Sequence, residues 1–540
     1  MSNLMTEFDA VIVGAGIAGL YQLYRLRNLG LRTHVLEAEK EVGGTWYLNK
    51  YPGARCDIKS IMYSYSFSPE LEQEWNWSEN YSNQPEILRY INHVADRFDL
   101  RKDITFNTRV TGALYNESSK RWEVHTDQGK TIRTQFLIMA TGCLSTPKQP
   151  EIPGIEKFQG SSYYTGRWPD KPVDFTGKRV AVIGTGSSAV QSIPIIAQQA
   201  SQLTVFQRSA ACCVPGLNYK LTADEIAASK ASYSTLRKAQ RESPGGFVDE
   251  RGSKSALEDS EEDRQARYEM LYQRGTLDAI IVCAYNDLVI NKEANDTFSE
   301  FIRQKIRSIV KDPVVADSLS PRGYAVGTKR ICLDYGYYET FNLDHVHLVD
   351  LTKTPILEMT EKGIRTSEKD HVFDAIVYAT GFDAITGTLT RIGIQGKNKL
   401  LLKDKWAKGP RTYLGIAIAE FPNLFTITGP FSPSVFTIMT VAIEQHVDWI
   451  TDCLKYLREH GVEEIEATVE AEDAWVEHSL AVANMTLFPK TASYYTGGNV
   501  EGKPFMLYPY VGGLANYRQV CDGVAAKGYE GFKLKTKGIV

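Results

Sequence analysis

Short, almost unbroken runs of apolar residues, each followed closely by glycine, recur along this chain. Such runs cover residues 8–13, 136–140, 180–183 and 375–379. Apolar runs of this length that end at glycine predict parallel strands buried on both faces of a sheet. Amphipathic helical patterns follow the first and third runs. The pattern therefore predicts an α/β fold.

The first run opens a complete dinucleotide-binding unit. It leads into Gly14, Gly16 and Gly19, then an amphipathic helix, then a strand over residues 33–36 that ends at Glu37. The glycines permit a sharp turn, close approach of backbone to a pyrophosphate, and tight packing of helix on strand. An acid at the end of the second strand accepts hydrogen bonds from a ribose 2′-hydroxyl. This unit predicts FAD or NAD.

A second unit of opposite character begins at residues 180–183. Gly184 and Gly186 form the turn, and Ser187 begins a helix whose free N–H groups would hold phosphates. The following strand ends at Arg208 instead of an acid, and a guanidinium fits a 2′-phosphate. The alternative is an ordinary glycine turn beside a solvated arginine. The order strand, turn, helix, strand and arginine favours NADP.

Glu37 would repel a 2′-phosphate and Arg208 would attract one, so the two units predict FAD in the first and NADPH in the second. Hydride would then pass from nicotinamide to flavin. After Glu37, a loop rich in glycine and aromatic residues contains Thr45 and Trp46, and its composition suggests that it wraps a flat ring. A surface loop with buried aromatic residues has the same composition.

The texture of the chain changes between residues 214 and 325. Charged helical patterns cover residues 223–242, 259–272 and 295–310. We expect a helical insertion within the NADP-binding domain. The predicted fold class is thus α/β, with two Rossmann-like dinucleotide-binding domains and this insertion. The expected boundaries are 1–144 and 381–540 for the FAD-binding domain, the second part including a substrate loop and a C-terminal segment, 145–213 and 326–380 for the NADP-binding domain, and 214–325 for the insertion.

Composition limits the class of protein. The 540 residues are 43% hydrophobic and 23% charged, with a net charge of −4, as in a globular enzyme with no bias toward nucleic acid or anionic membranes. No stretch is long enough for a membrane span, and no leader pattern opens the chain. The eight cysteines contain no C-x-x-C, so we expect reduced thiols, no metal and a cytoplasmic location. A monomer is expected, with an oligomer left open.

The chain resembles the flavoprotein Baeyer–Villiger monooxygenases that use FAD and NADPH, closest to the phenylacetone, steroid and cyclohexanone enzymes. Both glycine motifs carry the resemblance, as do Ala-Thr-Gly-Phe-Asp at 379–383 and the linker signature F-x-G-x-x-x-H-x-x-x-W-P at 158–169. Phe158, Gly160 and Trp168 keep that signature, while Tyr164 stands in place of the histidine. Six later segments also match: 409–415, 421–425, 429–430, 444–446, 485–489 and 529–532.

The resemblance implies a particular chemistry. NADPH reduces FAD, O2 adds to give a C4a-peroxyflavin, and its anion attacks the carbonyl of a ketone. A C–C bond then migrates to oxygen and yields an ester or lactone. The cofactor performs the hard chemistry, while the protein supplies placement and charge. The sequence leaves open whether the ketone is aromatic, alicyclic or steroidal.

The resemblance also assigns residues to roles. Arg330 matches the active-site arginine, whose permanent charge would stabilise the peroxy anion and the later oxyanion. Asp57 matches the acid that pairs with Arg330, and Lys329 matches a lysine that helps Arg208 hold the 2′-phosphate. Tyr494 stands where relatives have a tryptophan that contacts the nicotinamide nucleotide. A structural salt bridge is the commoner fate of an Asp/Arg pair, and the family match favours catalysis.

The substrate pocket is expected at a loop after residue 430. Its predicted lining residues are Phe431, Ser434, Val435 and Phe436. Bulky apolar side chains suggest a site for a hydrophobic ketone, although ordinary core filling explains each of them equally well.

Three other functions remain open. A related flavin monooxygenase could oxidise sulfur or nitrogen, because the protonated peroxyflavin is electrophilic. A flavin disulfide reductase is disfavoured by the absence of C-x-x-C. A nucleotide-binding module without enzymatic activity would lack the yellow colour of bound flavin.

Overall fold

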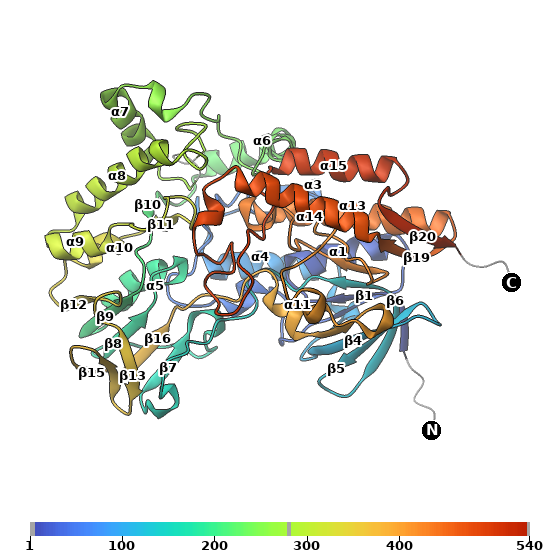
Figure 1. Ribbon diagram of the computed structural model, residues 1–540, viewed down its shortest axis with the longest axis horizontal. Helices are drawn as coiled ribbons and strands as arrows, with labels where there is room; N and C mark the ends of the chain where they lie inside the picture. Colours follow the sequence, from blue (N-terminus) through green and yellow to red (C-terminus); the bar gives the residue numbers. More distant parts are fainter. Residues whose placement is uncertain (1–5, 278–281, 537–540) are drawn as a thin grey trace.

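Two sheet-based units lie side by side in the computed structural model, which describes residues 6–277 and 282–536 (Figure 1). The sheet of the first unit, called the β1 unit here, has the order β17-β4-β5-β6-β1-β2-β3, with β18 also paired to β6. Its strands are β1 (Thr6–Val13), β2 (Thr33–Leu36), β3 (Ile104–Thr105), β4 (Val110–Asn116), β5 (Arg121–Thr126), β6 (Thr131–Met139), β17 (Gly393–Gln395) and β18 (Leu424–Thr426). The first predicted run and the strand before Glu37 therefore lie where the sequence places them.

Two long helices pack together on the β1 sheet. They are α1 (Ile17–Asn28) and α13 (Met439–Glu459), which are far apart in the chain. Tyr21 donates to Asp448 at 2.7 Å, and Gln22 donates to Thr451 at 3.2 Å. The C-terminal third of the chain is thus part of the first unit. Its other elements are α11 (Gly387–Arg391), α12 (Leu402–Lys405), β19 (Val462–Ala467), α14 (Val469–Asn484), α15 (Leu514–Ala526) and β20 (Phe532–Thr536).

The second unit, called the β8 unit, contains a fully parallel sheet of order β12-β9-β8-β16-β7. Its strands are β7 (Ser161–Tyr164), β8 (Arg179–Ile183), β9 (Gln202–Gln207), β12 (Val346–Asp350) and β16 (Ala375–Tyr378). Helix α5 (Ser187–Ala197) follows β8, as the second glycine motif predicts. A small antiparallel sheet lies beside it, made of β13 (Ile356–Thr360), β14 (Gly363–Thr366) and β15 (Asp370–Val372).

The helical insertion is divided between the two units. Helix α6 (Ala223–Glu242) packs on α3 (Pro69–Glu74) and α15 of the β1 unit. Arg237 of α6 binds Glu72 at 2.7 Å, and both side chains are almost fully buried. Helices α7 (Glu261–Tyr272), α8 (Lys292–Ile309) and α9 (Pro313–Leu319) instead join α10 (Tyr337–Thr340) of the β8 unit. Helix α6 therefore contacts the β1 unit, whereas α7, α8 and α9 lie with the β8 unit.

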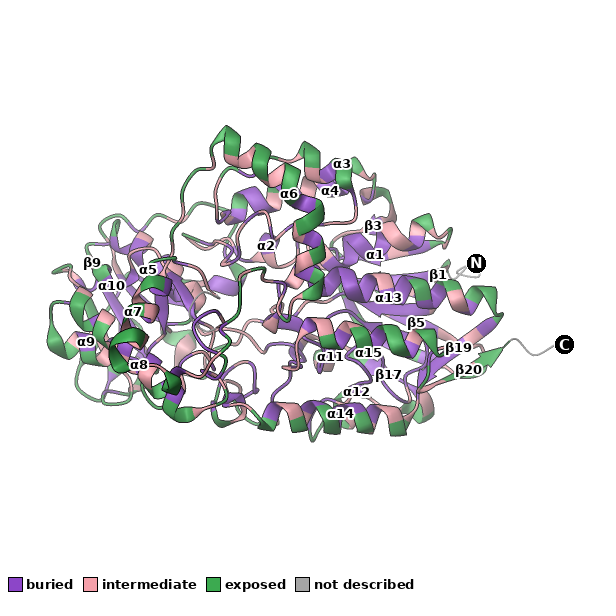
Figure 2. Cartoon of the chain, turned by 90° about the horizontal axis from the view of Figure 1, so that it is seen from above, coloured by how far each residue is buried: buried purple, intermediate pink, exposed green. Residues whose placement is uncertain are grey.

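The remaining elements connect these parts. Two short strands, β10 (Cys213–Pro215) and β11 (Cys332–Asp334), pair in parallel. The loops of the β1 unit contain α2 (Thr45–Leu48) and α4 (Gln84–Arg97). The central strands β6, β8 and β16 are mostly buried, and exposed residues gather on the outer faces of the helices (Figure 2). Strand β18 is short, because Asn423 and Thr428 on either side of it have φ of 57° and 55°.

Both glycine turns are built in the same way. Gly14 has φ of 106°, and a side chain there would meet the carbonyl oxygen of Ala140 at 2.6 Å. Gly184 has φ of 111°, and a side chain there would meet the carbonyl oxygen of Ala379 at 2.4 Å. In each unit, the first glycine thus lies against the alanine of an Ala-Thr-Gly sequence at the end of a neighbouring strand. Only glycine fits both the space and the left-handed backbone.

Candidate active site

One large cavity brings together half of the predicted site residues. Its volume is about 1080 Å³, which exceeds the usual size of a site for one small ligand. Segments of both units, the linker and the C-terminal third line it. The predicted residues among its walls are Gly14, Gly16, Glu37, Thr45, Trp46, Asp57, Tyr164, Ser187, Arg330, Val435 and Tyr494.

The end of the cavity near β1 suits a ribose and a pyrophosphate. The carboxylate of Glu37 is 7% exposed and accepts the amide N–H of Ala15 at 2.6 Å and of Glu39 at 2.8 Å. Burial raises the pKa of Glu37 above its ordinary value. Gly19 is not a lining residue, because a side chain there would lie 1.8 Å from the carbonyl oxygen of Gly14. Its role is to let α1 approach the turn.

The start of α5 offers an open approach to the backbone of the second glycine turn. A side chain at Gly186 would meet no atom of the described residues within 4 Å, so this face of the turn is open to a phosphate. Ser187 begins the helix, and its hydroxyl lies 3.3 Å from the thiol of Cys332. Gly184 does not line the cavity and shapes the turn from below.

Arg208 and Lys329 form a pair of cations outside the main cavity. Lys329 donates to Ser209 at 3.1 Å, next to the exposed Arg208. Burial, and then the charge of Arg208, lower the pKa of Lys329 below its ordinary value. Within residues 6–277 and 282–536, neither cation has a carboxylate partner. Two adjacent cations without a counter-charge are suited to a dianionic phosphate.

Asp57 and Arg330 meet across the two units. Nε and Nη2 of Arg330 each donate to one carboxylate oxygen of Asp57, both at 2.8 Å. Burial opposes the charge of Arg330, but the Asp57 carboxylate outweighs it, so the pKa of the guanidinium lies well above its ordinary value. Nη1 donates to the carbonyl oxygen of Val435 at 3.3 Å. Each side chain keeps 24% exposure and remains open to the cavity.

The four residues predicted for the substrate pocket differ in their surroundings. Val435 lines the cavity. Phe436 lies against the rings of Phe488 and Tyr495, and the hydroxyl of Ser434 lies 3.2 Å from the thiol of Cys143. Phe431 is fully buried in the hydrophobic core and does not line the cavity.

The linker residues serve two purposes. Phe158 lies over Gly160, where a side chain would clash with the phenyl ring at 2.4 Å, and Trp168 packs near Tyr163 in the core of the β8 unit. Tyr164 instead faces the cavity and stacks on Tyr378, with 4.8 Å between ring centroids. Phe158, Gly160 and Trp168 therefore shape the linker, whereas Tyr164 forms part of the cavity wall.

Tyr494 lines the cavity from the C-terminal third of the chain. Its ring contacts that of Tyr495, with 4.3 Å between centroids. Burial raises the pKa of both phenols above their ordinary value, so neither carries charge near neutral pH.

Comparison with known proteins identifies the family. The family model described as pyridine nucleotide-disulphide oxidoreductase matches residues 11–226, which contain both glycine motifs. A Baeyer–Villiger monooxygenase of Pseudooceanicola batsensis is 42% identical, over 97% of this chain and 95% of its own length. The chain belongs to the Baeyer–Villiger monooxygenase family. Cyclohexanone 1,2-monooxygenase of an Acinetobacter species is 42% identical over 99% and 98%, and phenazine N-monooxygenase of Lysobacter antibioticus is 40% identical over 99% and 97%.

Solved structures agree with this assignment. An oxidised steroid monooxygenase bound to NADP is 50% identical, covers 98% of this chain and 100% of its own, and superposes with a TM-score of 0.94. A complex of the enzyme OTEMO with FAD and NADP is 41% identical, covers 98% and 99%, and has a TM-score of 0.95. The predicted family, fold class and cofactor pair of this monooxygenase are confirmed.

The residues present fit these cofactors. Gly186 leaves open space at the second glycine turn, Glu37 would accept from a ribose beside the first turn, and Arg208 with Lys329 would hold a phosphate beside the second. Among the described residues, no three histidine, cysteine or acidic side chains are placed to share a metal ion. In the same part of the chain, no helix combines the length and apolarity that a membrane span requires.

Sequence reasoning missed several residues of this monooxygenase site. Arg55, Gln191 and Cys143 all line the cavity. Gln191 lies four positions after Ser187, so helical spacing places it on the same face and was an available signal. Cys143 directly follows the Ala-Thr-Gly sequence after β6, and this position was the only sequence signal that it lies at the cavity. Arg55 offered no signal, because its partners are remote in sequence.

Proposed function

We propose that this protein uses NADPH and O2 to convert a hydrophobic ketone into an ester or lactone. The observation that carries the proposal is the Asp57–Arg330 pair on the wall of a cavity that the first glycine turn and the start of α5 also border. Bound FAD, reduced by NADPH, supplies the activated oxygen. The role of the chain is to hold both cofactors and to provide a fixed positive charge where negative charge develops.

Arg330 is suited to that role by charge and by geometry. A guanidinium stays protonated at every working pH, and two bonds to Asp57 hold it in one orientation. Preorganised donors toward a developing oxyanion are commonly worth about 100- to 1000-fold in rate. Nη1 is directed toward the Val435 carbonyl, so the same arginine ties the substrate loop to the site.

The chemistry of the cavity wall supports an apolar substrate. In addition to Arg330, the residues that line the cavity include Leu144, Val435, Met439 and Ile443. Such side chains favour a hydrophobic molecule with a single polar group, as a ketone has. Relatives named for cyclohexanone and for steroid oxidation are consistent with this substrate class.

Oxygen transfer to nitrogen or sulfur is the second candidate. A phenazine N-monooxygenase is 40% identical over nearly the whole chain, so family membership does not decide which atom accepts oxygen. A lone pair on nitrogen or sulfur attacks an electrophilic oxygen and needs no cation to stabilise an oxyanion. The paired Arg330 therefore favours the ketone.

The test is product analysis with matched substrates. The purified protein should be yellow and should release FAD on denaturation. Aromatic, alicyclic and steroid ketones, a thioether and a phenazine are each incubated with NADPH in air, and product mass and NADPH consumption are recorded. We expect at least one ketone to gain one oxygen atom, giving an ester or lactone. Oxidation of only the thioether or the phenazine would reject the proposal in favour of the second candidate.

We further infer a cytoplasmic enzyme that works as a monomer. All eight cysteines are free and buried, which agrees with a reducing compartment. Cell fractionation and the mass of the native protein in solution test these two inferences.

A further inference from the structure

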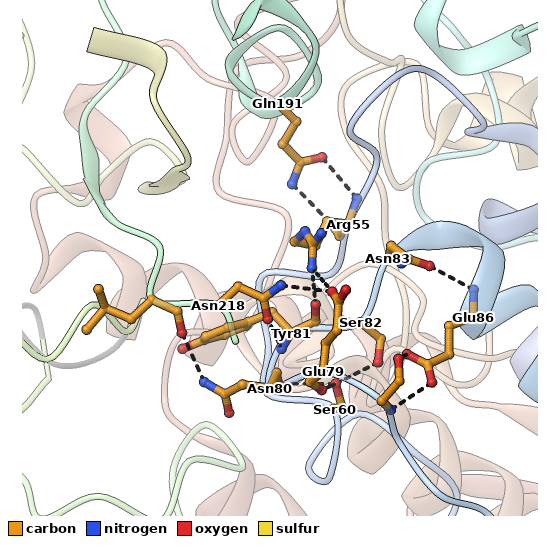
Figure 3. A network of polar contacts seen from close by, with 12 residues as sticks. Arg55, Ser60, Glu79, Asn80, Tyr81, Ser82, Asn83, Glu86, Gln191 and Asn218 are labelled. Atoms are coloured by element: carbon orange, nitrogen blue, oxygen red, sulfur yellow. Dashed lines mark hydrogen bonds and ion pairs between the residues drawn. The ribbon is translucent and has the colours of Figure 1, made fainter. Parts of the chain in front are cut away.

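Arg55 lies where four segments of the chain meet. It belongs to the loop of residues 51–57, which ends at Asp57. Its guanidinium binds Glu79 at 2.5 Å and the carbonyl oxygen of Tyr81, while Asn218 donates to the same Glu79 at 2.8 Å (Figure 3). The side chain of Arg55 thus fixes the loop to the β1 unit and to the segment that leads into α6.

The backbone of the same loop is held by Gln191 of α5, in the β8 unit. The Gln191 side chain donates from Nε2 to the carbonyl oxygen of Arg55 at 3.0 Å. Its Oε1 accepts the amide N–H of Arg55 at 3.3 Å and the hydroxyl of Tyr51 at 2.9 Å. One carboxamide therefore binds both the carbonyl oxygen and the amide N–H of Arg55. Figure 3 shows the Gln191 side chain reaching down to Arg55. The backbone also touches α5, since a side chain at Gly53 would lie 2.3 Å from the Gln191 carbonyl oxygen.

Gln191 lies on the same helix as the expected phosphate-binding residue Ser187, so a shift of the start of α5 would also move Gln191. It lies one helical turn after Ser187, and both residues line the cavity. A nucleotide pyrophosphate at the helix start would bind next to Ser187. The helix is a rigid connection between that phosphate and the loop at Arg55.

Arg330 is tied to the same helix through strand β11, which begins two residues after it. Cys332, two residues after Arg330, places its thiol 3.3 Å from the hydroxyl of Ser187. Asp57, two residues after Arg55, makes the two 2.8 Å bonds to Arg330. The ion pair is therefore connected to α5 from both ends, at Gln191 and at Ser187.

We propose that Gln191 is a positioning residue that couples nucleotide binding at the start of α5 to the placement of the Asp57–Arg330 pair. This inference rests on the proposed function for its purpose, but the coupling itself requires no ketone. Without Gln191, the loop of residues 51–57 stays attached to the β1 unit through Arg55 and Glu79 and no longer follows α5. Nucleotide binding would then leave Asp57 unaffected.

Hydrogen exchange of the loop tests the coupling directly. The FAD-loaded wild type, Gln191→Leu and Gln198→Leu are compared with and without saturating NADP+, with residue-level readout over 53–57. Gln198 is an exposed glutamine that caps the other end of the same helix, so its variant is the matched control. We expect NADP+ to slow exchange at Arg55 and Asp57 about fivefold or more in wild type and control, and not in Gln191→Leu. The change in flavin absorbance on adding NADP+ verifies that the nucleotide is bound.

A second variant guards against a folding defect. Gln191→Glu keeps both acceptor contacts but loses the donor to the Arg55 carbonyl, and it should retain about half or less of the NADP+-dependent slowing. Persistence of full slowing in both variants, or its absence in wild type, overturns the proposal. Neither result depends on which substrate the enzyme oxidises, so it leaves the proposed function to its own test.

Double variants distinguish positioning from general stability. Gln191→Leu should lower the share of NADPH that ends in ester and raise the share that ends in hydrogen peroxide. In an Asp57→Ala background, the same substitution should change this share less than about twofold, because residues acting as one unit are non-additive. Equal effects in both backgrounds would show that Gln191 acts independently of the ion pair.

Discussion

Asp57 holds Arg330 through two parallel hydrogen bonds of 2.8 Å, although 273 positions separate them in the chain. The carboxylate comes from the β1 unit and the guanidinium from the β8 unit. The charged centre of the site is therefore assembled only when both units are in place.

Replacing the arginine separates the two halves of the reaction. Arg330→Ala should still oxidise NADPH, because hydride transfer precedes the step that needs the cation, but ester formation should fall by about 100-fold or more. Arg330→Lys keeps the charge and loses the two-pronged geometry, so it should retain partial activity. NADPH consumption and product are measured together. Normal ester yield in Arg330→Ala would remove the assigned role.

The cation pair at Arg208 and Lys329 sets the nucleotide preference. Arg208→Ala should weaken NADPH binding by roughly 1.5–3 kcal/mol, the usual worth of a charged hydrogen bond, and hardly change NADH binding. Lys329→Ala should act in the same direction. Arg322→Ala serves as control, because this exposed arginine pairs with Asp317 and should affect neither nucleotide. Equal losses for NADPH and NADH would refute a 2′-phosphate site.

Tyr164 stands at the histidine position of the linker signature, and Tyr494 stands where the family resemblance leads us to expect a tryptophan. Tyr164 and Tyr494 both line the cavity, and burial raises the pKa of each, so neither supplies positive or negative charge at neutral pH. Tyr164→His and Tyr494→Trp should hold NADP more firmly and reduce the hydrogen peroxide formed per NADPH. Peroxide is measured with and without a ketone substrate. Unchanged leakage in both variants would mean that these positions do not control NADP retention.

His446 makes stability depend on pH in the acid range. Its Nδ1 accepts the amide N–H of Thr428 at 3.0 Å and its Nε2 lies 2.7 Å from the Tyr517 hydroxyl, so the ring is neutral. Burial lowers its pKa from 6.5 to about 3. Below pH 6.5 the unfolded chain therefore binds a proton at His446 that the folded protein does not bind. As the pH falls from 6.5 to about 3, the free energy of unfolding decreases by about 1.4 kcal/mol per pH unit. His446→Gln should weaken this dependence between pH 7.5 and 5.5, as measured by the urea midpoint.

Glu444, two residues earlier, provides a control of opposite sign. Burial, partly offset by hydrogen bonds from Ser66, raises its pKa from 4.5 to about 7. The stability that the protonated Glu444 carboxyl contributes is fully present below pH 4.5 and is lost as the pH rises through 7. Glu444→Gln should therefore stabilise the protein at pH 8 more than at pH 5. His446→Gln should improve stability at low pH relative to high pH, and Glu444→Gln should do the opposite. If both variants shift the pH dependence of stability in the same direction, the assignment of these two groups is wrong.

The sequence predicts local features of this protein well. Each glycine turn lies between a strand and a helix because its residues act on their immediate neighbours, and Glu37 and Arg208 follow from strand ends. Helix α6 begins at Ala223 and ends at Glu242, as its charge pattern predicts. What the pattern cannot give is the partner of a helix, and the buried Arg237–Glu72 pair draws α6 to the β1 unit.

The candidate site divides in the same manner. Asp57 and Arg330 entered the prediction through resemblance, since no spacing relates them. The loop at 431–436 contains three bulky apolar side chains, yet its backbone directs Phe431 into the core and Val435 into the cavity. Helical spacing places Gln191 on the same face as Ser187, but its role becomes apparent only with its partners Tyr51 and Arg55, which are remote in sequence.

The matching glycine turns at Gly14 and Gly184 have a consequence for redesign. Each rests against the alanine of its own Ala-Thr-Gly sequence at nearly the same φ, so the main chain offers both nucleotides the same cradle. Discrimination between them is left to side chains farther along, an acid in one copy and an arginine in the other. Coenzyme choice can therefore be changed through a few side chains without altering either main-chain scaffold.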